Sequence, residues 1–199
     1  MEYLDRKKLT FFLAVVFVSI LVGQVRAQQA TISVVPASYT SPTVGSSFAV
    51  NVTVQNVEDL YGWSLQLFYP NNALNGTSVT QGPFLKAGGN SPIFIIINFT
   101  DNYNATYGVV YALCTRQGEV PGVNGAGTLA TITFTSTSTS SAQILHLADI
   151  ELSNSTPGPI SFTSVDGEVT VLPEFSAVLI LPLLVASTIV AVVLRKKSR

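Results

Sequence analysis

One stretch of alternating residues constrains the fold more than any other feature of the chain. It spans residues 60–74 with the sequence LYGWSLQLFYPNNAL. A period of two predicts a β-strand with one face in a core and the other face outward. The predicted inward residues are Trp63, Leu65, Leu67 and Tyr69, and the predicted outward residues are Ser64, Gln66 and Phe68. Pro70 and Asn71 should end the strand, because proline lacks a ladder donor and asparagine favours turns.

Apolar residues are concentrated at the two ends of the 199-residue chain. Residues 1–27 have a basic start, an apolar run and the small residue Ala27 at the expected cleavage position. This pattern predicts a secretory signal peptide, with an uncleaved N-terminal anchor as the alternative. Residues 175–194 carry no charge and precede a basic cluster, which predicts a transmembrane helix with a cytoplasmic C-terminus. We therefore expect a cell-surface protein whose middle part is extracellular.

The intervening residues 28–172 predict one domain that is long enough to bury a sizeable core. Its basic residues are Lys86 and Arg116, against eight Asp and Glu. This balance argues against a nucleic-acid partner, because phosphates require clustered positive charge. Cys114 is the only cysteine of the chain and cannot form an internal disulfide, so we expect a buried thiol, with a disulfide between two chains as the alternative.

Short alternating segments separated by Gly, Pro and Asn predict an all-β fold, a sandwich of about nine strands. Residues 75–89 are interpreted as a loop-rich connection. The almost continuously apolar run at 93–99 favours a strand buried on both faces. Besides the central stretch, strands are expected at residues 31–35, 48–54, 93–99, 109–114, 128–135, 144–152 and 167–171.

Four segments are distinctive when taken in order: NVTVQNVEDLYGWSLQLFY, GVVYALC, GAGTLATITF and ADIELSNSTPGPISFTSVDGEVTV. Together they resemble the cohesin family. The resemblance implies a nine-stranded jelly-roll β-sandwich, close to carbohydrate-binding modules, that binds a dockerin module. Such modules tether polysaccharide-degrading enzymes, and dockerins fold around calcium. Where cohesins usually have Tyr-Asp-Pro, this chain has Tyr69-Pro70-Asn71, and Gly62 and Ser64 stand where polar partner-contacting residues often occur.

The resemblance also implies a docking sheet made of the third, fifth, sixth and eighth strands. By alternation, Val110, Ala112 and Cys114 should point into the core. A register shift of one residue would exchange the two faces, so ordinary packing is the alternative. The predicted partner-binding face consists of Ser64, Gln66, Phe68, Val109, Tyr111 and Leu113, with His146 as a further candidate.

The sequence favours recognition over catalysis. No nucleophile motif, phosphate-binding loop or His/Cys/Asp cluster occurs, so we expect no enzyme, cofactor or catalytic residue. The acidic pairs Glu58/Asp59, Asp149/Glu151 and Asp166/Glu168 are most simply solvated, although the last two could hold calcium. One alternative to dockerin binding is a structural or adhesive role in the cell envelope. The other is direct carbohydrate binding through exposed aromatic residues, drawn from Tyr39, Tyr61, Phe68, Tyr103, Tyr107 and Tyr111.

Two kinds of modification signal complete the sequence. Five N-glycosylation sequons begin at Asn51, Asn75, Asn98, Asn104 and Asn154. A glycan at Asn98 would crowd the edge of the docking sheet. The tripeptide Pro173-Glu174-Phe175, followed by the apolar span and the basic end, is similar to the archaeal PEF sorting signal. That similarity implies an archaeosortase-type protease, removal of the helix and attachment to a lipid, and a plain membrane anchor is the alternative.

Overall fold

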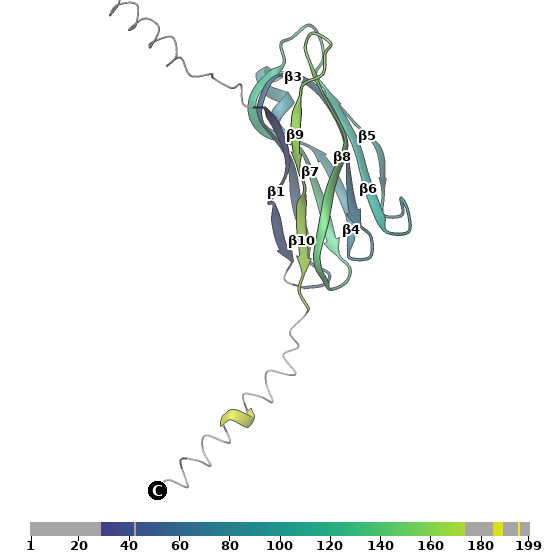
Figure 1. Cartoon of the computed structure of the whole chain (residues 1–199), viewed down its shortest axis with the longest axis vertical. Helices are drawn as coiled ribbons and strands as arrows, with labels where there is room; N and C mark the ends of the chain where they lie inside the picture. The colour runs from purple at the N-terminus through teal and green to yellow at the C-terminus, as the bar shows by residue number, and fades with distance from the viewer. Residues whose placement is uncertain (1–28, 42, 174–184, 189–194, 196–199) are drawn as a thin grey trace, which may run out of the picture.

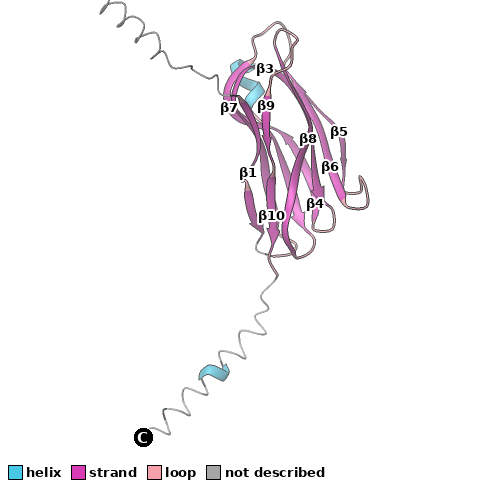
Figure 2. Ribbon diagram, viewed as in Figure 1, coloured by secondary structure: helices cyan, strands magenta, loops and turns pink. Residues whose placement is uncertain are grey.

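The computed structural model describes residues 29–41, 43–173, 185–188 and 195, and its strands form a two-layer β-sandwich (Figures 1 and 2). The predicted signal peptide, Glu174 and Phe175 of the sorting motif, and most of the predicted transmembrane helix lie outside these residues. Within the described residues no helix has the length and apolar character needed to cross a membrane.

Ten strands and one short 3-10 helix make up the described domain. One sheet contains β9 (Phe162–Val165), β1 (Ala30–Val35), the first half of β3 (Ser47–Pro70), β7 (Val123–Ser136) and β4 (Leu74–Gln81), in that order. The other sheet contains β2 (Ser38–Ser41), β10 (Gly167–Val171), β8 (Ser140–Asn154), the second half of β3, β6 (Tyr107–Thr115) and β5 (Ile93–Thr100). The 3-10 helix η1 is Phe84–Gly89.

The long strand β3 belongs to both sheets. The two strands expected at 48–54 and from Trp63 are therefore one continuous strand of 24 residues. Its first half pairs with β1 and β7, and its second half pairs with β6 and β8. The register shifts between Val54 and Leu60, where Asn56 and Asp59 have φ of 54° and 56°. Asn and Asp tolerate this left-handed region better than other side chains, so the chain can bend here without a glycine.

Asp59 fixes this bend through its side chain. One carboxylate oxygen accepts from the amide of Gly122 at 2.7 Å, and the other accepts from the hydroxyl of Ser155 at 2.7 Å and its amide at 3.1 Å. The hydrogen bond from the Ser155 hydroxyl and that from the Gly122 amide lower the pKa of Asp59. The residue therefore holds together three segments that are distant in sequence.

The predicted core side of the sandwich is confirmed. Trp63, Leu65, Leu67 and Tyr69 are all buried, as are Val110, Ala112 and Cys114 on the neighbouring strand β6. Tyr69 packs edge-on against Phe134 of the opposite sheet, with ring centroids 4.9 Å apart. Its hydroxyl donates to Asp101 at 2.7 Å, and burial together with that carboxylate raises the Tyr69 pKa. The thiol of Cys114 is free and buried, and burial raises its pKa.

Two strand predictions were wrong for a common reason. Residues 75–81, expected as part of a loop-rich connection, belong to β4, because the polar strand LNGTSVTQ lies at a sheet edge and carries no apolar alternation. Residues 93–99, expected to be buried on both faces, belong to the edge strand β5, which pairs only with β6. Ile93, Ile95, Ile96 and Ile97 are consequently 42–49% exposed. Sequence composition did not reveal which strands would lack a neighbour.

Candidate partner-binding face

The residues predicted to bind a partner come together on one sheet. Strands β8, β3, β6 and β5 are neighbours in that order. The six predicted residues of β3 and β6 form three directly opposed pairs, Ser64 with Leu113, Gln66 with Tyr111, and Phe68 with Val109. Because the alternate residues of both strands are buried in the core, these pairs lie on the outer face of the sheet. We call this surface the β8-β3-β6-β5 face.

Exposure separates one of the six residues from the others. Ser64, Gln66, Phe68, Tyr111 and Leu113 are partly exposed. Val109 was predicted to be exposed, but it is only 1% exposed, and it does not belong to the main core cluster. It lies between Phe68 and Thr100 in the ladder, so its neighbours on the outer face cover it. Val109 therefore supports this surface and cannot contact a partner directly.

The flanking strands add Ile95 and Glu151 to this face, and they confirm the position of His146, already a candidate, and of Asn98, expected at the edge of the sheet. On β5, Ile95 lies opposite Leu113 and Asn98 lies opposite Tyr111. On β8, Glu151 lies opposite Ser64 and His146 lies opposite Phe68. The β8 pairs could not be derived by alternation, because a register shift between Ser64 and Gln66 breaks the period of two. The β8-β3-β6-β5 face is therefore apolar at its centre and along β5, and it is more polar along β8.

An aromatic cleft of about 430 Å³ opens at one end of the face. Phe68 lies edge-on to Tyr103 and to Tyr107, with ring centroids 5.3 and 6.4 Å apart. Asn104 shapes the loop, because its side-chain oxygen accepts from the amides of Thr106 and Tyr107, both at 2.8 Å. The cleft is lined by Phe68, Tyr103, Asn104, Tyr107, Ile144 and His146.

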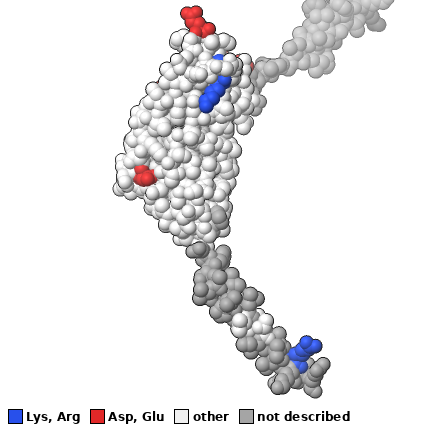
Figure 3. All heavy atoms as spheres, turned by 180° about the vertical axis from the view of Figure 1, so that it is seen from behind, with Lys and Arg blue, Asp and Glu red and all other residues white. Residues whose placement is uncertain are grey.

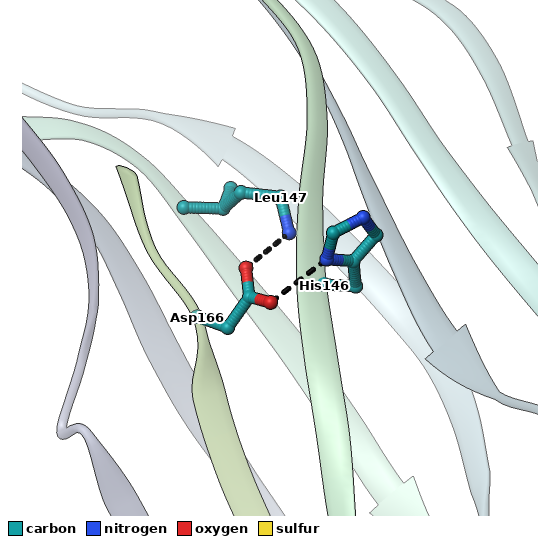
Figure 4. A network of polar contacts seen from close by, with 3 residues as sticks. All are labelled: His146, Leu147 and Asp166. Atoms are coloured by element: carbon teal, nitrogen blue, oxygen red, sulfur yellow. Dashed lines mark hydrogen bonds and ion pairs between the residues drawn. The ribbon is translucent and has the colours of Figure 1, made fainter. Parts of the chain in front are cut away.

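His146 is oriented by a carboxylate on the neighbouring segment. Its Nδ1 lies 2.8 Å from Oδ2 of Asp166, and the other oxygen of Asp166 accepts from the amide of Leu147 at 2.9 Å (Figure 4). The imidazole therefore has a defined position at the cleft. Asp166, a candidate for half of a calcium pair, instead links the β9–β10 connection to β8.

Charged and metal-binding groups are sparse. Figure 3 shows one side of the sandwich with only a few Lys, Arg, Asp and Glu, which lie far apart. In the described part of the chain, no three His, Cys, Asp or Glu side chains come together as a metal site. The register shift in β8 also interrupts the alternation that would place Asp149 and Glu151 on one face. Among the described residues, neither acidic pair that could hold calcium gains a third acidic ligand.

The sequons differ in their relation to the face. Asn98 lies on it, partly exposed and opposite Tyr111. Asn104 is exposed and lines the aromatic cleft. Asn51 lies on the other sheet, where its side-chain oxygen accepts from the hydroxyl of Thr131 at 2.7 Å. Asn75 is exposed at the start of β4, and Asn154 is partly exposed at the end of β8. A glycan at Asn98 would cover part of the apolar centre, and its presence stays a prediction.

Comparison with known proteins identifies the family. The model of the cohesin domain matches residues 32–171. The chain belongs to the cohesin domain family. A search of curated proteins found no match. The resemblance noted from the sequence is thereby confirmed for the domain. Cohesin modules are non-catalytic interaction domains, which agrees with the expectation that the chain is not an enzyme.

Solved structures support the same fold. The chain is similar to the non-cellulosomal cohesin of the hyperthermophilic archaeon Archaeoglobus fulgidus, with 19% identity, a TM-score of 0.55, and coverage of 73% of this chain and 92% of that chain. It is also similar to a chain of a type I cohesin–dockerin complex from Clostridium thermocellum, with 15% identity, a TM-score of 0.58, and coverage of 75% and 97%. A third similar structure is the solution structure of CaCohA2 from Clostridium acetobutylicum, with 17% identity, a TM-score of 0.57, and coverage of 74% and 93%.

Proposed function

We propose that this chain is a non-enzymatic recognition module at the cell surface that binds a dockerin-bearing extracellular protein. The observation that carries the proposal is the apolar centre of the β8-β3-β6-β5 face, where Phe68, Tyr111 and Leu113 are partly exposed. Interface centres are enriched in aromatic residues and depleted in charge, with polar residues at the rim. Ser64, Gln66 and Glu151 would supply such a polar side.

Membership in the cohesin family supports a dockerin as the partner. Several similar structures are described as cohesin–dockerin complexes. The partner would carry calcium in its own acidic loops, since this chain offers no cluster of three acidic ligands among its described residues. A role in polysaccharide binding or breakdown would then belong to the enzyme that carries the dockerin.

Surface attachment is part of the same proposal and rests on the two ends of the sequence. A signal peptide at 1–27 would export the domain, and the apolar span at 175–194 with its basic end would hold it at the membrane. If an archaeosortase-type protease acts at the Pro173-Glu174-Phe175 motif, a lipid would replace the helix. In either case the domain ends at residue 172, directly beside the anchor, so its reach toward partners is short.

A pull-down with matched variants tests the proposal. The bait is residues 28–172, which contain all ten strands, and the source is the organism's secreted and envelope fraction with and without calcium. We expect calcium-dependent capture of a protein with paired acidic loops, and loss of capture with Tyr111→Asp. The control is Thr133→Asp, a partly exposed residue in a strand of the opposite sheet. Equal loss with both variants, or calcium-independent capture, would overturn the proposal.

Direct carbohydrate binding is a second candidate, favoured by the aromatic cleft. Sugar rings stack on aromatic faces, and Phe68, Tyr103 and Tyr107 line one cleft together with the oriented imidazole of His146. A polysaccharide array probed with residues 28–172 distinguishes this candidate. If carbohydrate binding is the function, Tyr103→Ala should abolish the signal, and Tyr111→Asp should preserve it because Tyr111 does not line the cleft.

A further inference from the structure

The edge strand β5 differs from the other strands that have a single partner. Within the described residues, β2, β9, β4 and β5 each pair with one neighbour only. Strands β2 and β9 have four residues each, and β4 is the polar strand LNGTSVTQ. Short or polar edges are the ways in which proteins avoid unwanted strand pairing. Strand β5, at the right-hand edge in Figure 1, has eight residues with the uncharged sequence IFIIINFT.

The exposed isoleucines of β5 lie on both sides of the sheet. Ile93 and Ile95 pair with Thr115 and Leu113, so they belong to the outer face. Ile96 pairs with the buried Ala112 and should therefore point to the core side, yet it is 42% exposed. The opposite layer thus does not cover β5 completely. A partner lying flat on the outer face would cover Ile93 and Ile95 but would leave Ile96 in water.

We propose that two copies of this chain associate edge to edge through antiparallel pairing of their β5 strands. Only a strand added beside β5 can cover isoleucines on both sides while it satisfies the free backbone groups of the edge. Such a strand should itself be uncharged and apolar on both sides. Among the described strands with one partner, β5 alone has this character, so a second β5 is the best match.

The twofold arrangement has no electrostatic penalty at its centre. Ile93–Thr100 contains no ionisable residue, so the two strands bring no like charges together even though the domain is acidic overall. The regular ladder is limited to Ile93–Ile96, because the register with β6 shifts between Ile96 and Asn98. The two sheets would join into one continuous sheet, with the two β8-β3-β6-β5 faces side by side and available to two partner molecules.

Disulfide trapping in the full-length chain tests the geometry. Cysteine is introduced at Ile93, at Ile95 or at both in a Cys114→Ala background, and the chain is oxidised in the membrane of its expression host. Antiparallel neighbours have Cα atoms about 4.5–5.5 Å apart, which falls within the range that a disulfide requires. We expect a covalent dimer for at least one of the three variants, because these three cover every register that places the outward isoleucines opposite one another. The matched control is cysteine at Thr80, an exposed outward residue on the edge strand β4, which should remain monomeric.

The mass of residues 28–172 in solution provides the second measurement. We expect a concentration-dependent dimer by sedimentation equilibrium, and at least about tenfold weaker association for Ile95→Lys, because a charge would be forced into the joined edge. Thr80→Lys, at an exposed position on β4, should leave the dimer unchanged, and far-UV circular dichroism verifies that both variants are folded. A monomer at all concentrations, equal trapping at β4 and β5, or a dimer that tolerates Ile95→Lys would each overturn the proposal. Neither measurement uses a dockerin, so the result is independent of the proposed function.

Discussion

The two sheets of the sandwich pack against one common core, but their outer faces differ strongly in composition. On the sheet that contains β1 and β7, outward hydroxyl and amide groups bond to one another across neighbouring strands. These bonds join Ser33 to Thr53, Ser47 to Thr135, Thr131 to Asn51 and Thr31 to Thr163, at 2.7–3.2 Å. On the β8-β3-β6-β5 face the corresponding positions hold Phe68, Tyr111, Leu113, Ile93 and Ile95.

This difference indicates which side of the molecule gains from association. The outer face of the sheet that contains β1 and β7, here called the hydroxyl-rich face, already satisfies many of its polar groups through hydrogen bonds. A partner would have to replace those bonds with equivalent ones. The apolar face gains about 25 cal/mol for each Å² of apolar surface that a partner removes from water. Since the core is shared by both sheets, the outward residues alone produce the contrast. The proposed partner binding would therefore depend on positions that contribute little to folding.

The largest expected effect is a difference in thiol reactivity between a cysteine on the core side of β6 and one on its outer side. Cys114 is 2% exposed, so its modification by a maleimide requires the strand to open. We expect the double variant Leu113→Cys/Cys114→Ala to react at least about a thousandfold faster than wild type, because opening a stable core costs several kcal/mol. Measurement of the rate by mass spectrometry, with an unfolded control for each protein, checks this. Comparable native rates would mean that β6 is in the opposite register.

Partner affinity should show the next largest effect. We expect Leu113→Ala and Phe68→Ala each to lower the affinity for the captured partner by about 30-fold or more, which corresponds to about 2 kcal/mol for a central interface residue. Thr53→Ala, at a partly exposed position of the hydroxyl-rich face, should leave affinity unchanged. Isothermal titration of the partner into each variant measures this. If Thr53→Ala weakened binding as much as Leu113→Ala does, the partner would not be specific for the β8-β3-β6-β5 face, and the assignment of binding to that face would be wrong.

Removal of a tyrosine hydroxyl should lower the free energy of unfolding more on the core side of the sheet than on its outer face. Tyr69→Phe deletes a buried hydroxyl that donates to Asp101 and to the Thr100 carbonyl, so we expect a loss of about 1–3 kcal/mol. Tyr111→Phe deletes a hydroxyl on the outer face and should change the free energy of unfolding by no more than about 0.5 kcal/mol. Urea denaturation of residues 28–172 measures both. A larger loss for Tyr111→Phe would show that its hydroxyl, and not that of Tyr69, stabilises the fold.

Local alternation predicted the sides of the central strands correctly because it depends only on the backbone period of two. Trp63, Leu65, Leu67 and Tyr69 are buried as expected, and Ser64, Gln66 and Phe68 are not. The cohesin resemblance correctly indicated the fold and which strands adjoin one another. Alternation failed where the backbone leaves its regular period, as in β8, where Asp149 has a φ of 44° and the register with β3 shifts.

Burial at edges and clefts could not be predicted from the sequence, because it depends on neighbours that are distant in the chain. The run at 93–99 has the composition of a fully buried strand, yet its position at an edge leaves four isoleucines exposed. Val109 has the correct parity for an outward residue but is covered by its surroundings. Tyr103 and Tyr107 were recognised only as available aromatics. The loop between β5 and β6 brings Tyr103 to Phe68, and Tyr107 reaches Phe68 from the start of β6.

Asp59 connects the two contrasting sheets, because it sits at the bend where β3 passes from one to the other. Its folded pKa is lowered by the hydroxyl of Ser155 and the amide of Gly122, relative to an ordinary value of 3.8. A lowered carboxyl pKa stabilises the fold above the unfolded pKa, and this stabilisation is lost as the pH falls through the folded pKa. Because the carboxylate is near the surface, solvent screens it, and we expect its loss to change stability less than the loss of the Tyr69 hydroxyl.

The Asp59→Asn variant isolates that charge, since Asn also tolerates the left-handed backbone at this position. We expect the variant to be less stable than wild type at pH 6, and the two stabilities to converge as the pH falls below 3.8. Thermal unfolding over a pH series measures the difference. A gap that persists unchanged at low pH would mean that the hydrogen-bond geometry, and not the charge, holds the bend between the hydroxyl-rich sheet and the apolar one.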